Sequence, residues 1–447
     1  MDIVKDSVFE TAERYVRCTD KSVFLTGKAG TGKTTFLKYL TLNISKRFVV
    51  LAPTGVAAIN AGGTTIHSFF QLPLCPYLPD VKELITEYQM PDKYRKPNKE
   101  RLKIFRTLDL LIIDEISMVR ADILDAVDMT LRLFRRNDKP FGGVQLLMIG
   151  DANQLSPVVK ESERQYMERV YPAPYFFHSK ALQKLDYIII ELQQVHRQKD
   201  NDFLEILNAV RENRVTESVL EKLNARVGAF PADDDVIRLT THNAQADKIN
   251  DTRLAMLPGK PSTFEAVVEG DFPENSYPAE PLLTLKVGAR VMFVRNDPEG
   301  HFYNGKIGTV EGISRDGVVT VSDGSRTPIV VKPIDWDNIQ YALDEESGEI
   351  MPGVVGKFRQ LPLRIAWAVT VHKSQGSEYR AVILAAWNGS PYLLSRSILY
   401  TAITRARELL IIAGRAETVA AMTENAKRNR RYSGLKLRLA SCEDDPA

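Results

Sequence analysis

The residues with the clearest chemical role lie in a glycine-rich segment near the start of the chain, residues 27–35, which reads Gly-Lys-Ala-Gly-Thr-Gly-Lys-Thr-Thr. An apolar run at 23–25 precedes it and an amphipathic run at 36–40 follows it, so the sequence predicts a strand, a loop and a helix with the G-x-x-x-x-G-K-T spacing. The backbone N–H groups of such a loop and the positive end of the helix dipole hold phosphate groups. Because the flanking strand and helix are both present, a chance glycine-rich turn is disfavoured. The segment predicts a nucleoside triphosphate site.

The residue types within this loop suggest separate roles. Lys33 is expected to reach the terminal phosphates, and the Thr34 hydroxyl is expected to ligate Mg²⁺. The other loop residues expected to touch the nucleotide are Gly27, Ala29, Gly30, Thr31, Gly32 and Thr35.

Two neighbouring carboxylates, Asp114 and Glu115, follow the apolar run at 110–113. In a parallel sheet that carries a phosphate loop, this end of a strand faces the bound nucleotide. We expect Asp114 to hold Mg²⁺ through water and Glu115 to orient or deprotonate the attacking water. The plainer alternative is that Asp114 caps the next helix. The pair of carboxylates favours hydrolysis over binding alone.

A third apolar run, at 144–149, leads into Gly-Asp-Ala-Asn-Gln at 150–154. A glutamine at this rim of the sheet is placed to contact the γ-phosphate and report its hydrolysis. Gln154 taken alone would more often be a solvated loop residue, but its position after the third strand favours the phosphate contact.

The elements that must position these residues alternate between strand-like and helical patterns over the first 190 residues, which predicts a parallel sheet with helices on both faces. Prolines interrupt the pattern at 72–98 and predict an inserted subdomain or long loop. A second alternating unit starts near residues 187–190. Within it, Asn-Gly and Asp-Gly turns between short β runs predict a small inserted β-barrel at about 280–350.

Composition bounds the class of protein without deciding its partner. The 447 residues suit about three domains, and a 44% hydrophobic share suits a globular protein. No apolar run reaches the roughly 18 residues of a membrane span, and the N-terminus lacks the apolar core of a signal peptide. Three widely spaced cysteines favour a reducing, intracellular compartment and neither a disulfide framework nor a zinc site. The net charge of +2 neither supports nor excludes a nucleic acid.

Four segments, residues 26–35, 52–58, 113–119 and 150–154, occur in order along the chain. Together they resemble the motor motifs of superfamily-one helicases, and most closely the PIF (petite integration frequency) family of 5′→3′ DNA helicases. The resemblance implies an α/β fold with two tandem RecA-like P-loop motor domains with parallel sheets. It also implies ATP and Mg²⁺ as cofactors, translocation along single-stranded DNA and unwinding of duplex DNA.

On this resemblance we expect the first motor domain at 1–190, with a wedge-like insert at 72–98. The second is expected at 191–425, with the small barrel inserted, and is followed by a C-terminal tail at 426–447.

The resemblance also assigns nucleotide-site residues in the second half of the chain. Arg197 would contact the γ-phosphate, and Arg405 would act as an arginine finger, for which an always-charged, bidentate guanidinium is suited. Gly376 and Glu378 would contact the nucleotide, with Glu378 reaching the ribose. Because Arg405 comes from the second domain, fast hydrolysis would require the cleft to close, which couples chemistry to domain motion.

The expected nucleic-acid residues come from both halves of the chain and would mainly hold phosphate oxygens, which positions a strand without reading its sequence. Phe69, together with Phe70, is a candidate for base stacking, and burial in the core is an equally weighted alternative. The full set is Pro53, Thr54, Gly55, Thr64, His67, Phe69, Thr370, His372, Lys373 and Ser374.

The sequence also departs from the PIF pattern. The family's adenine-recognising glutamine precedes the phosphate loop, whereas the first glutamine here is Gln71, which leaves adenine selectivity open. Residues 375–379 and 395–431 look more like RecD, the exonuclease V α-subunit helicase. The alternatives are therefore a RecD-type helicase subunit of a recombination nuclease, a non-unwinding ATP-gated binder of single-stranded DNA, and, less favoured, a P-loop kinase.

The expected partners are single-stranded DNA and 5′-tailed duplexes, with G-quadruplexes and RNA–DNA hybrids as further candidates. We expect no membrane partner and a monomeric motor that acts in replication, recombination, repair or telomere maintenance. A cytoplasmic, nucleoid-associated bacterial location is favoured, with the nucleus or mitochondrion as the alternative.

Overall fold

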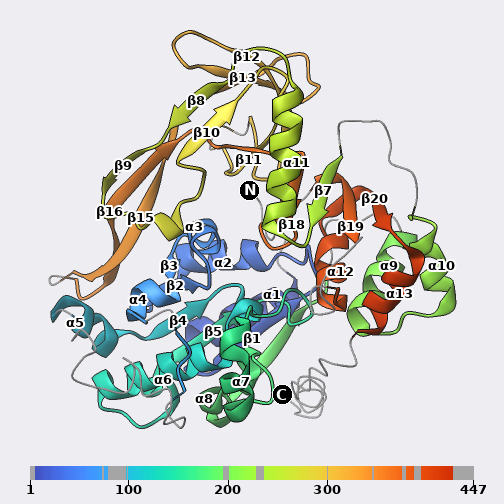
Figure 1. Cartoon of the computed structure of the whole chain (residues 1–447). Helices are drawn as coiled ribbons and strands as arrows, with labels where there is room; N and C mark the ends of the chain where they lie inside the picture. The colour runs from blue at the N-terminus through green and yellow to red at the C-terminus, as the bar shows by residue number, and fades with distance from the viewer. Residues whose placement is uncertain are drawn as a thin grey trace.

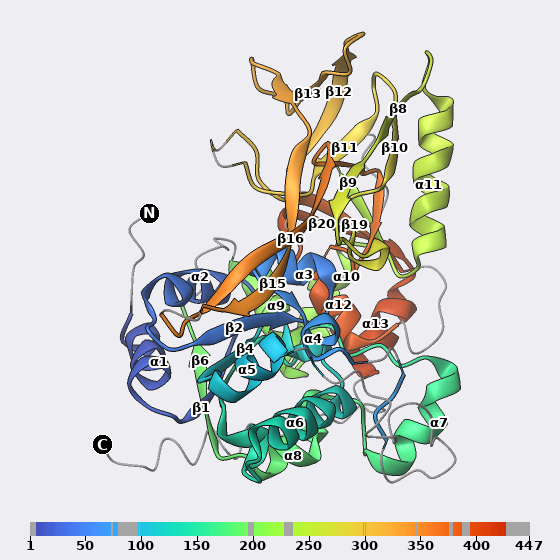
Figure 2. The ribbon, with the colours of Figure 1, turned by 90° about the vertical axis from the view of Figure 1, so that its left-hand side faces the viewer.

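The computed structural model describes residues 6–72, 75–78, 97, 99–194, 201–227, 236–297, 299, 301–344, 347–374, 379–386 and 394–425. Two α/β units and a region of antiparallel strands make up this part of the chain (Figures 1 and 2). None of the helices among the described residues is long and apolar enough to cross a lipid bilayer.

The first α/β unit is built on a six-stranded sheet in the order β3-β2-β4-β5-β1-β6, and every neighbouring pair is parallel. Its strands are β1 (Ser22–Gly27), β2 (Phe48–Ala52), β3 (Thr64–Thr65), β4 (Leu110–Ile113), β5 (Gln145–Ile149) and β6 (Tyr187–Leu192). Its helices are α1 (Ser7–Cys18), α2 (Lys33–Asn43), α3 (Gly55–Ala61), α4 (Ile66–Phe70), α5 (Lys99–Thr107), α6 (Ala121–Arg135), α7 (Glu161–Val170) and α8 (Lys180–Lys184).

The strands of this sheet are apolar throughout because both of their faces are covered. Successive side chains alternate between two cores: Val23 and Leu25 pack with α1 and α2, whereas Phe24 packs with α4, α5, α6 and α8 on the other face. This two-sided burial confirms the parallel α/β prediction for the first half of the chain.

The second α/β unit has a four-stranded parallel sheet in the order β18-β7-β19-β20. Its strands are β7 (Ile237–Thr240), β18 (Ala368–Thr370), β19 (Tyr379–Ala386) and β20 (Ala406–Gly414). Its helices are α9 (Asn201–Glu212), α10 (Glu217–Asn224), α11 (Asn243–Met256), α12 (Arg396–Ile403) and α13 (Ala416–Glu424). The core of this unit combines β7, β18, β19 and β20 with α9, α10, α12 and α13.

The antiparallel region is formed by the residues between α11 and β18 along the chain, and most of it is seen in the upper part of Figure 1. One sheet has the order β14-β13-β12-β11-β17, a second has β15-β16-β9, and β10 pairs with β8. The strands are β8 (Ser262–Glu265), β9 (Val267–Gly270), β10 (Leu282–Leu285), β11 (Arg290–Phe293), β12 (Ile307–Ile313), β13 (Val319–Ser322), β14 (Ile329–Val331), β15 (Ile334–Leu343), β16 (Ile350–Gln360) and β17 (Leu363–Ile365). Closure of these strands into a small barrel at 280–350 stays a prediction.

One strand assignment of the sequence interpretation was wrong. The apolar run at 187–190 was expected to start the second unit, but it forms β6, which pairs in parallel with β1 from Ser22 to Gly27 and completes the first sheet. An apolar run carries no mark of the strand it will pair with, so this assignment needed the structure. The predicted wedge at 72–98 and the tail at 426–447 lie almost wholly outside the described residues.

A long hairpin, β15–β16, extends from the antiparallel region onto the first sheet (Figure 2). Its residue Tyr341 stacks edge-on against Phe69, with ring centroids 5.9 Å apart, and Ile350 joins the first unit's core. The Tyr341 hydroxyl accepts a hydrogen bond from the backbone N–H of Val50 at 3.0 Å. Strand β3 pairs with β2 only at Leu51 and Ala52, so the hairpin supplies the partner for Val50 at this edge of the sheet.

The Tyr341→Phe substitution tests this contact, because it removes the hydroxyl and keeps the ring. Losing one such hydrogen bond should lower the free energy of local opening by about 0.5–1.5 kcal/mol. Hydrogen–deuterium exchange should therefore speed up at the Val50 amide and leave β5 unchanged. Lys357→Ala, at an exposed position on the same hairpin, is the control. Unchanged protection at Val50 would contradict the contact.

Candidate nucleotide and nucleic-acid site

The phosphate loop follows β1 and turns directly into α2, which begins at Lys33. Two glycines are required by its geometry. Gly32 caps the helix with φ at 88°, a conformation that side-chain-bearing residues rarely adopt. At Gly27, a Cβ atom would lie 2.7 Å from the carbonyl oxygen of Leu192 on β6. Gly32 is therefore needed for the left-handed turn into α2, and Gly27 for the close approach of the loop to β6.

The side chain of Lys33 lies over this loop. Its Nζ donates to the carbonyl oxygens of Gly27 at 2.7 Å and Lys28 at 2.9 Å. Thr31 also donates to Lys28, through its hydroxyl at 2.9 Å. The lysine ammonium is thus already held at the mouth of the loop, and Thr34 is exposed at the start of the helix. The contacts of Lys33 to phosphate and of Thr34 to a cation stay predictions.

The carboxylates lie beside the loop because β4, β5 and β1 are neighbours in the sheet and their carboxyl ends meet at one edge. Burial and the neighbouring Glu115 carboxylate raise the pKa of Asp114 to about 7, while the charge of Lys33 lowers it. Glu115 adopts a left-handed conformation, φ 51° and ψ 42°, which costs a residue with a side chain about 1–2 kcal/mol. A strained acidic residue in this position is typical of a functional site.

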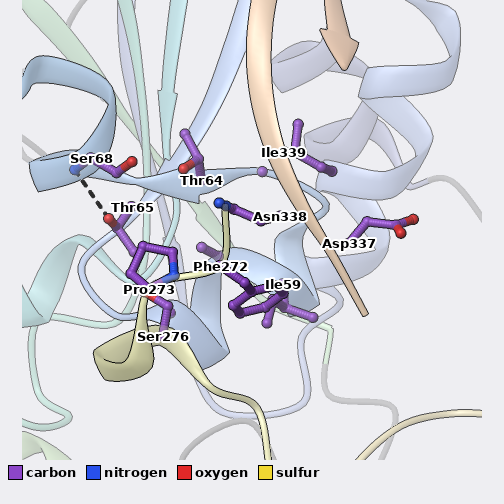
Figure 3. Close-up of a pocket in the computed structure, with 13 residues that line it drawn as sticks. Ile59, Thr64, Thr65, Ser68, Phe272, Pro273, Ser276, Asp337, Asn338 and Ile339 are labelled. Carbon is purple, nitrogen blue, oxygen red and sulfur yellow. Dashed lines mark hydrogen bonds between the residues drawn. The ribbon is translucent and has the colours of Figure 1, made fainter. Parts of the chain in front are cut away.

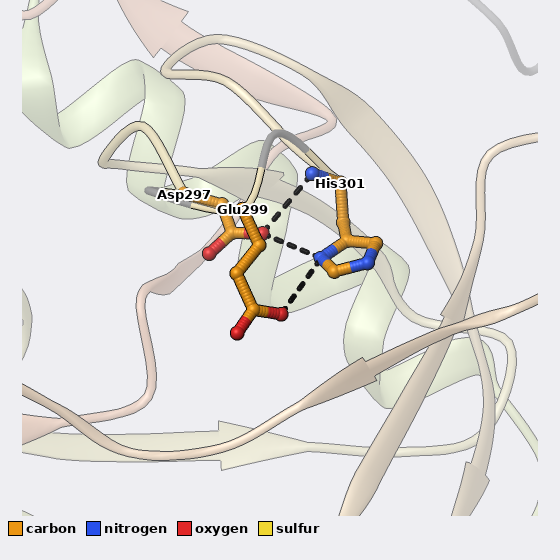
Figure 4. A group of neighbouring side chains, drawn as sticks. All are labelled: Asp297, Glu299 and His301. Carbon is orange, nitrogen blue, oxygen red and sulfur yellow. Dashed lines mark hydrogen bonds and ion pairs between the residues drawn. The ribbon is translucent and has the colours of Figure 1, made fainter.

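Asp114 and Thr34 fit a divalent cation chemically. Mg²⁺ prefers oxygen ligands, and these two residues offer a carboxylate and a hydroxyl oxygen. A cation would also offset the repulsion between Asp114 and Glu115 that raises the pKa of Asp114. Outside this site, Asp297, Glu299 and His301 form a further group of possible ligands within the described chain (Figure 4). Asp297 there accepts hydrogen bonds from the backbone N–H of His301 at 3.0 Å and from its ring at 2.7 Å, which explains the cluster as a turn.

The loop after β5 belongs to the first α/β unit and packs against the second. Gln154 is buried, and its backbone N–H donates to the carbonyl oxygen of Asp151 at 3.0 Å. The next residue, Leu155, lies in the core of the second unit, and Met118 from the first unit packs against the same core. Gln154 is therefore the direct sequence neighbour of a residue that packs in the core of the second unit.

Arg405 comes from the second unit, between α12 and β20, and is buried. Its guanidinium donates to the carbonyl oxygens of Thr401 at 3.1 Å and Ser374 at 3.4 Å, and to the Thr404 hydroxyl at 3.1 Å. Burial lowers the pKa of Arg405, and the negative charge of Glu115 opposes this shift. An arginine of the second unit is thus close enough to Glu115 of the first for the two charges to interact.

Three residues of this site were missed by the sequence interpretation: Asp151, Arg211 and Tyr400. The Tyr400 hydroxyl donates to Asp151 at 3.2 Å, and Arg211 lies 3.6 Å from the other oxygen of the same carboxylate. Asp151 stands in the segment that the sequence singled out for Gln154, so its position at the strand end was the available signal. Three of the predicted site residues, Arg197, Gly376 and Glu378, lie outside the described part of the chain.

The first-unit nucleic-acid residues lie around α3 and α4, where the antiparallel region approaches them (Figure 3). The exposed Thr54 caps α3 by accepting from the N–H of Ala57 at 3.2 Å, and Pro53 precedes it. Gly55 comes so close to Ser276 that a Cβ atom there would be 3.0 Å from the Ser276 Cα. A pocket between the two regions is lined by Gly55, Ala58, Ile59, Gly63, Thr64, Thr65, Ser68, Phe272, Pro273, Ser276, Asp337, Asn338 and Ile339.

Within this group, Thr64 and His67 differ in what they can offer a phosphate. Thr64 is largely buried in β3 but borders the pocket. Burial and the charge of Arg120 lower the pKa of His67, so at neutral pH it is an uncharged hydrogen-bonding group.

Phe69 was wrongly proposed for base stacking. Its side chain is 4% exposed and packs edge-on against Phe70, Phe105 and Tyr341 in the first core. A base could reach this ring only by displacing the core, so the alternative of core burial holds for Phe69 and Phe70.

The segment after β18 holds the second group of predicted nucleic-acid residues. Ser374 has no exposed surface and donates its hydroxyl to Val371 at 2.7 Å, whereas the Thr370 hydroxyl accepts from the N–H of Lys373 at 3.2 Å. The Ser374 hydroxyl is already used as a donor within the turn, which corrects its prediction as a phosphate donor. The Thr370 hydroxyl only accepts in this turn, and its phosphate contact stays a prediction. Lys373 is exposed, and burial lowers the pKa of the half-buried His372.

The fold and site together define a class of protein. Two α/β units with parallel sheets, a phosphate loop with adjacent carboxylates on one and a facing arginine on the other, are the parts of a P-loop nucleoside triphosphatase with two RecA-like domains. The model of the PIF1-like helicase family matches residues 3–221, and that of the UvrD-like helicase C-terminal domain matches 365–413. The chain belongs to the PIF1-like helicase family.

Two curated relatives illustrate the relationship. The chain is 33% identical over 422 residues to the ATP-dependent DNA helicase Pif1 of Psychrobacter sp., covering 80% of this chain and 60% of the relative. It is 31% identical over 395 residues to the ATP-dependent DNA helicase Pif1 of Bdellovibrio bacteriovorus, covering 87% and 82% respectively. The chain spans 57% of the length of the human PIF1 helicase and 59% of the length of the Danio rerio PIF1 helicase.

Solved structures of Bacteroides sp. Pif1 match over nearly the whole chain. The unliganded protein superposes with a TM-score of 0.80 at 35% identity, over 96% of this chain and 98% of that chain. The same protein bound to single-stranded DNA gives 0.63 at 34% identity, with the same coverage. The arrangement described here is therefore closer to the DNA-free form of that protein than to its DNA-bound form.

Replacing Lys33 tests the phosphate loop. Lys33→Ala removes the ammonium held at the loop's mouth by the carbonyl oxygens of Gly27 and Lys28, and should slow nucleoside triphosphate hydrolysis by about 10²–10³ or more, the range for losing one preorganised electrostatic contact. Phosphate release measures it, with Lys38→Ala on the exposed face of α2 as the control. Hydrolysis at the unmodified rate would remove Lys33 from this role.

Proposed function

We propose that this chain is an ATP- and Mg²⁺-dependent DNA helicase that moves 5′→3′ along single-stranded DNA and unwinds duplexes. The observation that carries the proposal is the electrostatic attraction between the buried Arg405 and Glu115, because the two residues come from different α/β units. A binding protein needs no such pair. A motor needs it, since hydrolysis then depends on how the two units sit together.

The hydrolytic step follows from the residues at the cleft. Lys33 and the loop N–H groups hold the terminal phosphates, and Thr34 and Asp114 would hold Mg²⁺, which neutralises charge on the phosphates when bound. Glu115 orients the attacking water, and its left-handed backbone fixes the direction of the carboxylate. Arg405 stabilises the charge that develops on the transferred phosphoryl group, and Arg197 is proposed to assist from the same unit.

The strand is proposed to run across both units. Lys373 and His372 would hold it on the second unit, and the α3–α4 segment, with Pro53, Thr54, Gly55, Thr64 and His67, would hold it on the first. The antiparallel region stands over this segment, with Ser276 against Gly55. The lower TM-score against the DNA-bound Bacteroides protein supports the proposal that strand binding accompanies a different arrangement of these parts.

The remaining expectations belong to the same proposal. The motor domains are proposed at 1–190 and 191–425, and Gly376 and Glu378 are proposed to contact the nucleotide. The proposed substrates are 5′-tailed duplexes, with G-quadruplexes and RNA–DNA hybrids as further ones, and the motor is proposed to act as a monomer in replication, recombination or repair. A bacterial, nucleoid-associated location is favoured.

Unwinding assays on matched substrates test the proposal. With ATP and Mg²⁺, the protein should separate a duplex that carries a 5′ single-stranded tail and leave unchanged the same duplex with a 3′ tail. Separation of the 3′-tailed duplex alone would reverse the assigned direction. ATP-dependent binding without any separation would replace the motor by an ATP-gated DNA-binding protein.

The Arg405→Ala substitution tests the facing arginine. It should preserve nucleotide binding, because Lys33 and the loop are untouched, and slow hydrolysis by about 10³–10⁵, the typical contribution of an arginine finger. Arg405→Lys should remain slow, since lysine lacks the planar, bidentate head group. Single-turnover hydrolysis measures the effect, and Arg14→Ala on the exposed face of α1 is the control. A near-normal rate in Arg405→Ala would show that the arginine is misassigned.

A further inference from the structure

A buried polar cluster joins the two α/β units beside the phosphate loop. Its centre is Asp151, whose side chain has no exposed surface and follows β5 in the first unit. Tyr400, on α12 of the second unit, donates its hydroxyl to Asp151 Oδ2 at 3.2 Å and is itself 2% exposed. Arg211, on α9 of the second unit, lies 3.6 Å from Asp151 Oδ1 and donates to Glu191 of β6 at 3.0 Å. Both units thus contribute to one cluster.

The cluster also reaches the phosphate loop. The backbone N–H of Ala29 interacts with the Tyr400 oxygen that bonds Asp151. Lys28 lies close enough to Arg211, Glu191 and Asp151 for their charges to shift its pKa, which is lowered chiefly by burial. Loop N–H groups of this kind are donors for nucleotide phosphates. The Tyr400 hydroxyl therefore lies beside the backbone of the phosphate loop, whose N–H groups a phosphate site uses.

The same tyrosine is tied to the facing arginine. Tyr400 lies five residues before Arg405, on the helix that leads into it, and the Arg405 guanidinium donates to the Thr401 carbonyl oxygen on that helix at 3.1 Å. On the first unit, Asp151 and Gln154 belong to one turn, joined by the 3.0 Å backbone hydrogen bond between them.

We propose that Tyr400 is a positioning residue that sets the register of α12 on the phosphate loop and Asp151, and so places Arg405 at the reacting phosphate. Tyr400 acts through Arg405 and touches no reacting atom. Arg211 holds the far side of the same carboxylate, so that Asp151 is fixed between two elements of the second unit. The inference rests on the proposed function, because it assumes that Arg405 acts on the nucleotide.

Tyr400→Phe removes only the hydroxyl. We expect nucleotide affinity to change less than about twofold and the maximal hydrolysis rate to fall about 10- to 100-fold, the range for losing a hydrogen bond to a charged group. The split between an unchanged nucleotide KM and a reduced kcat is the signature of positioning. Rates are measured with ATP, both without DNA and with saturating single-stranded DNA.

The chain offers a matched control. Tyr171 also donates a buried hydroxyl to an aspartate, Asp125, at 2.7 Å, but in the first unit and outside the cluster. Tyr171→Phe therefore removes the same kind of hydrogen bond and should lower the melting temperature without changing kcat. If Tyr400→Phe and Tyr171→Phe affect kcat equally, the Tyr400 contact is only structural and the proposal is overturned.

A second variant keeps the test decisive. Asp151→Asn weakens both the Tyr400 and the Arg211 contacts and should lower kcat at least as much. The double variant with Tyr400→Phe should lose less than the sum of the two single losses, because the two substitutions share one contact. If Tyr400→Phe fails to fold, Asp151→Asn alone carries the test by the same split between kcat and KM. A kcat within twofold of the unmodified protein in both variants overturns the proposal. An inactive unmodified protein would instead overturn the proposed function itself.

Discussion

The site depends on the burial of opposite charges where the two α/β units meet: the Arg405 guanidinium on one unit and the Asp114 and Glu115 carboxylates on the other. Burying an arginine guanidinium costs free energy unless hydrogen-bond acceptors surround it. Arg405 donates to two carbonyl oxygens and one hydroxyl, and the negative charge of Glu115 attracts it. The carboxylates carry the complementary problem, since burial and mutual repulsion raise the pKa of Asp114. The buried arginine and the buried carboxylates thus each carry charge that the protein compensates only in part. In the proposed function, a bound nucleotide and its cation supply the opposite charges.

Parallel sheets solve the geometric part of this problem. The carboxyl ends of β4, β5 and β1 bring the carboxylates, the Asp151–Gln154 turn and the phosphate loop to one edge. The second sheet delivers Arg405 through α12 and Ser374 through the turn after β18. Contacts beyond the cleft then determine how the units sit together, with Leu155 in the second core and Tyr341 of the long hairpin on the edge of β2.

Much of the site was predictable because its chemistry is local. The loop at 27–35 and the carboxylates after 110–113 are each encoded within a few residues, and their elements formed as expected. Pairing was not predictable in the same way. Residues 187–190 read as a strand, but only the structure gives their partner, β1. Phe69 shows the same limit at the level of one side chain, since the pattern of a short helix does not say which face meets the core.

The prediction for the Ser374 hydroxyl failed for a different reason. A serine or threonine near a strand end can bond a ligand or its own backbone, and here the Ser374 hydroxyl donates within a turn. Tyr400 and Asp151 were out of reach because 249 residues separate them along the chain. Contacts of that kind arise only when both units fold and dock.

The central claim is that strand binding brings the two units together so that Arg405 and Glu115 act on one phosphate. ATP hydrolysis with and without single-stranded DNA, at matched low and moderate salt, tests it most directly. The account predicts a rise of at least about tenfold with DNA, equivalent to about 1.4 kcal/mol of activation free energy, that the Arg405→Ala protein does not share. An equal rate with and without DNA would contradict the account, because the two units would then not be coupled by the strand.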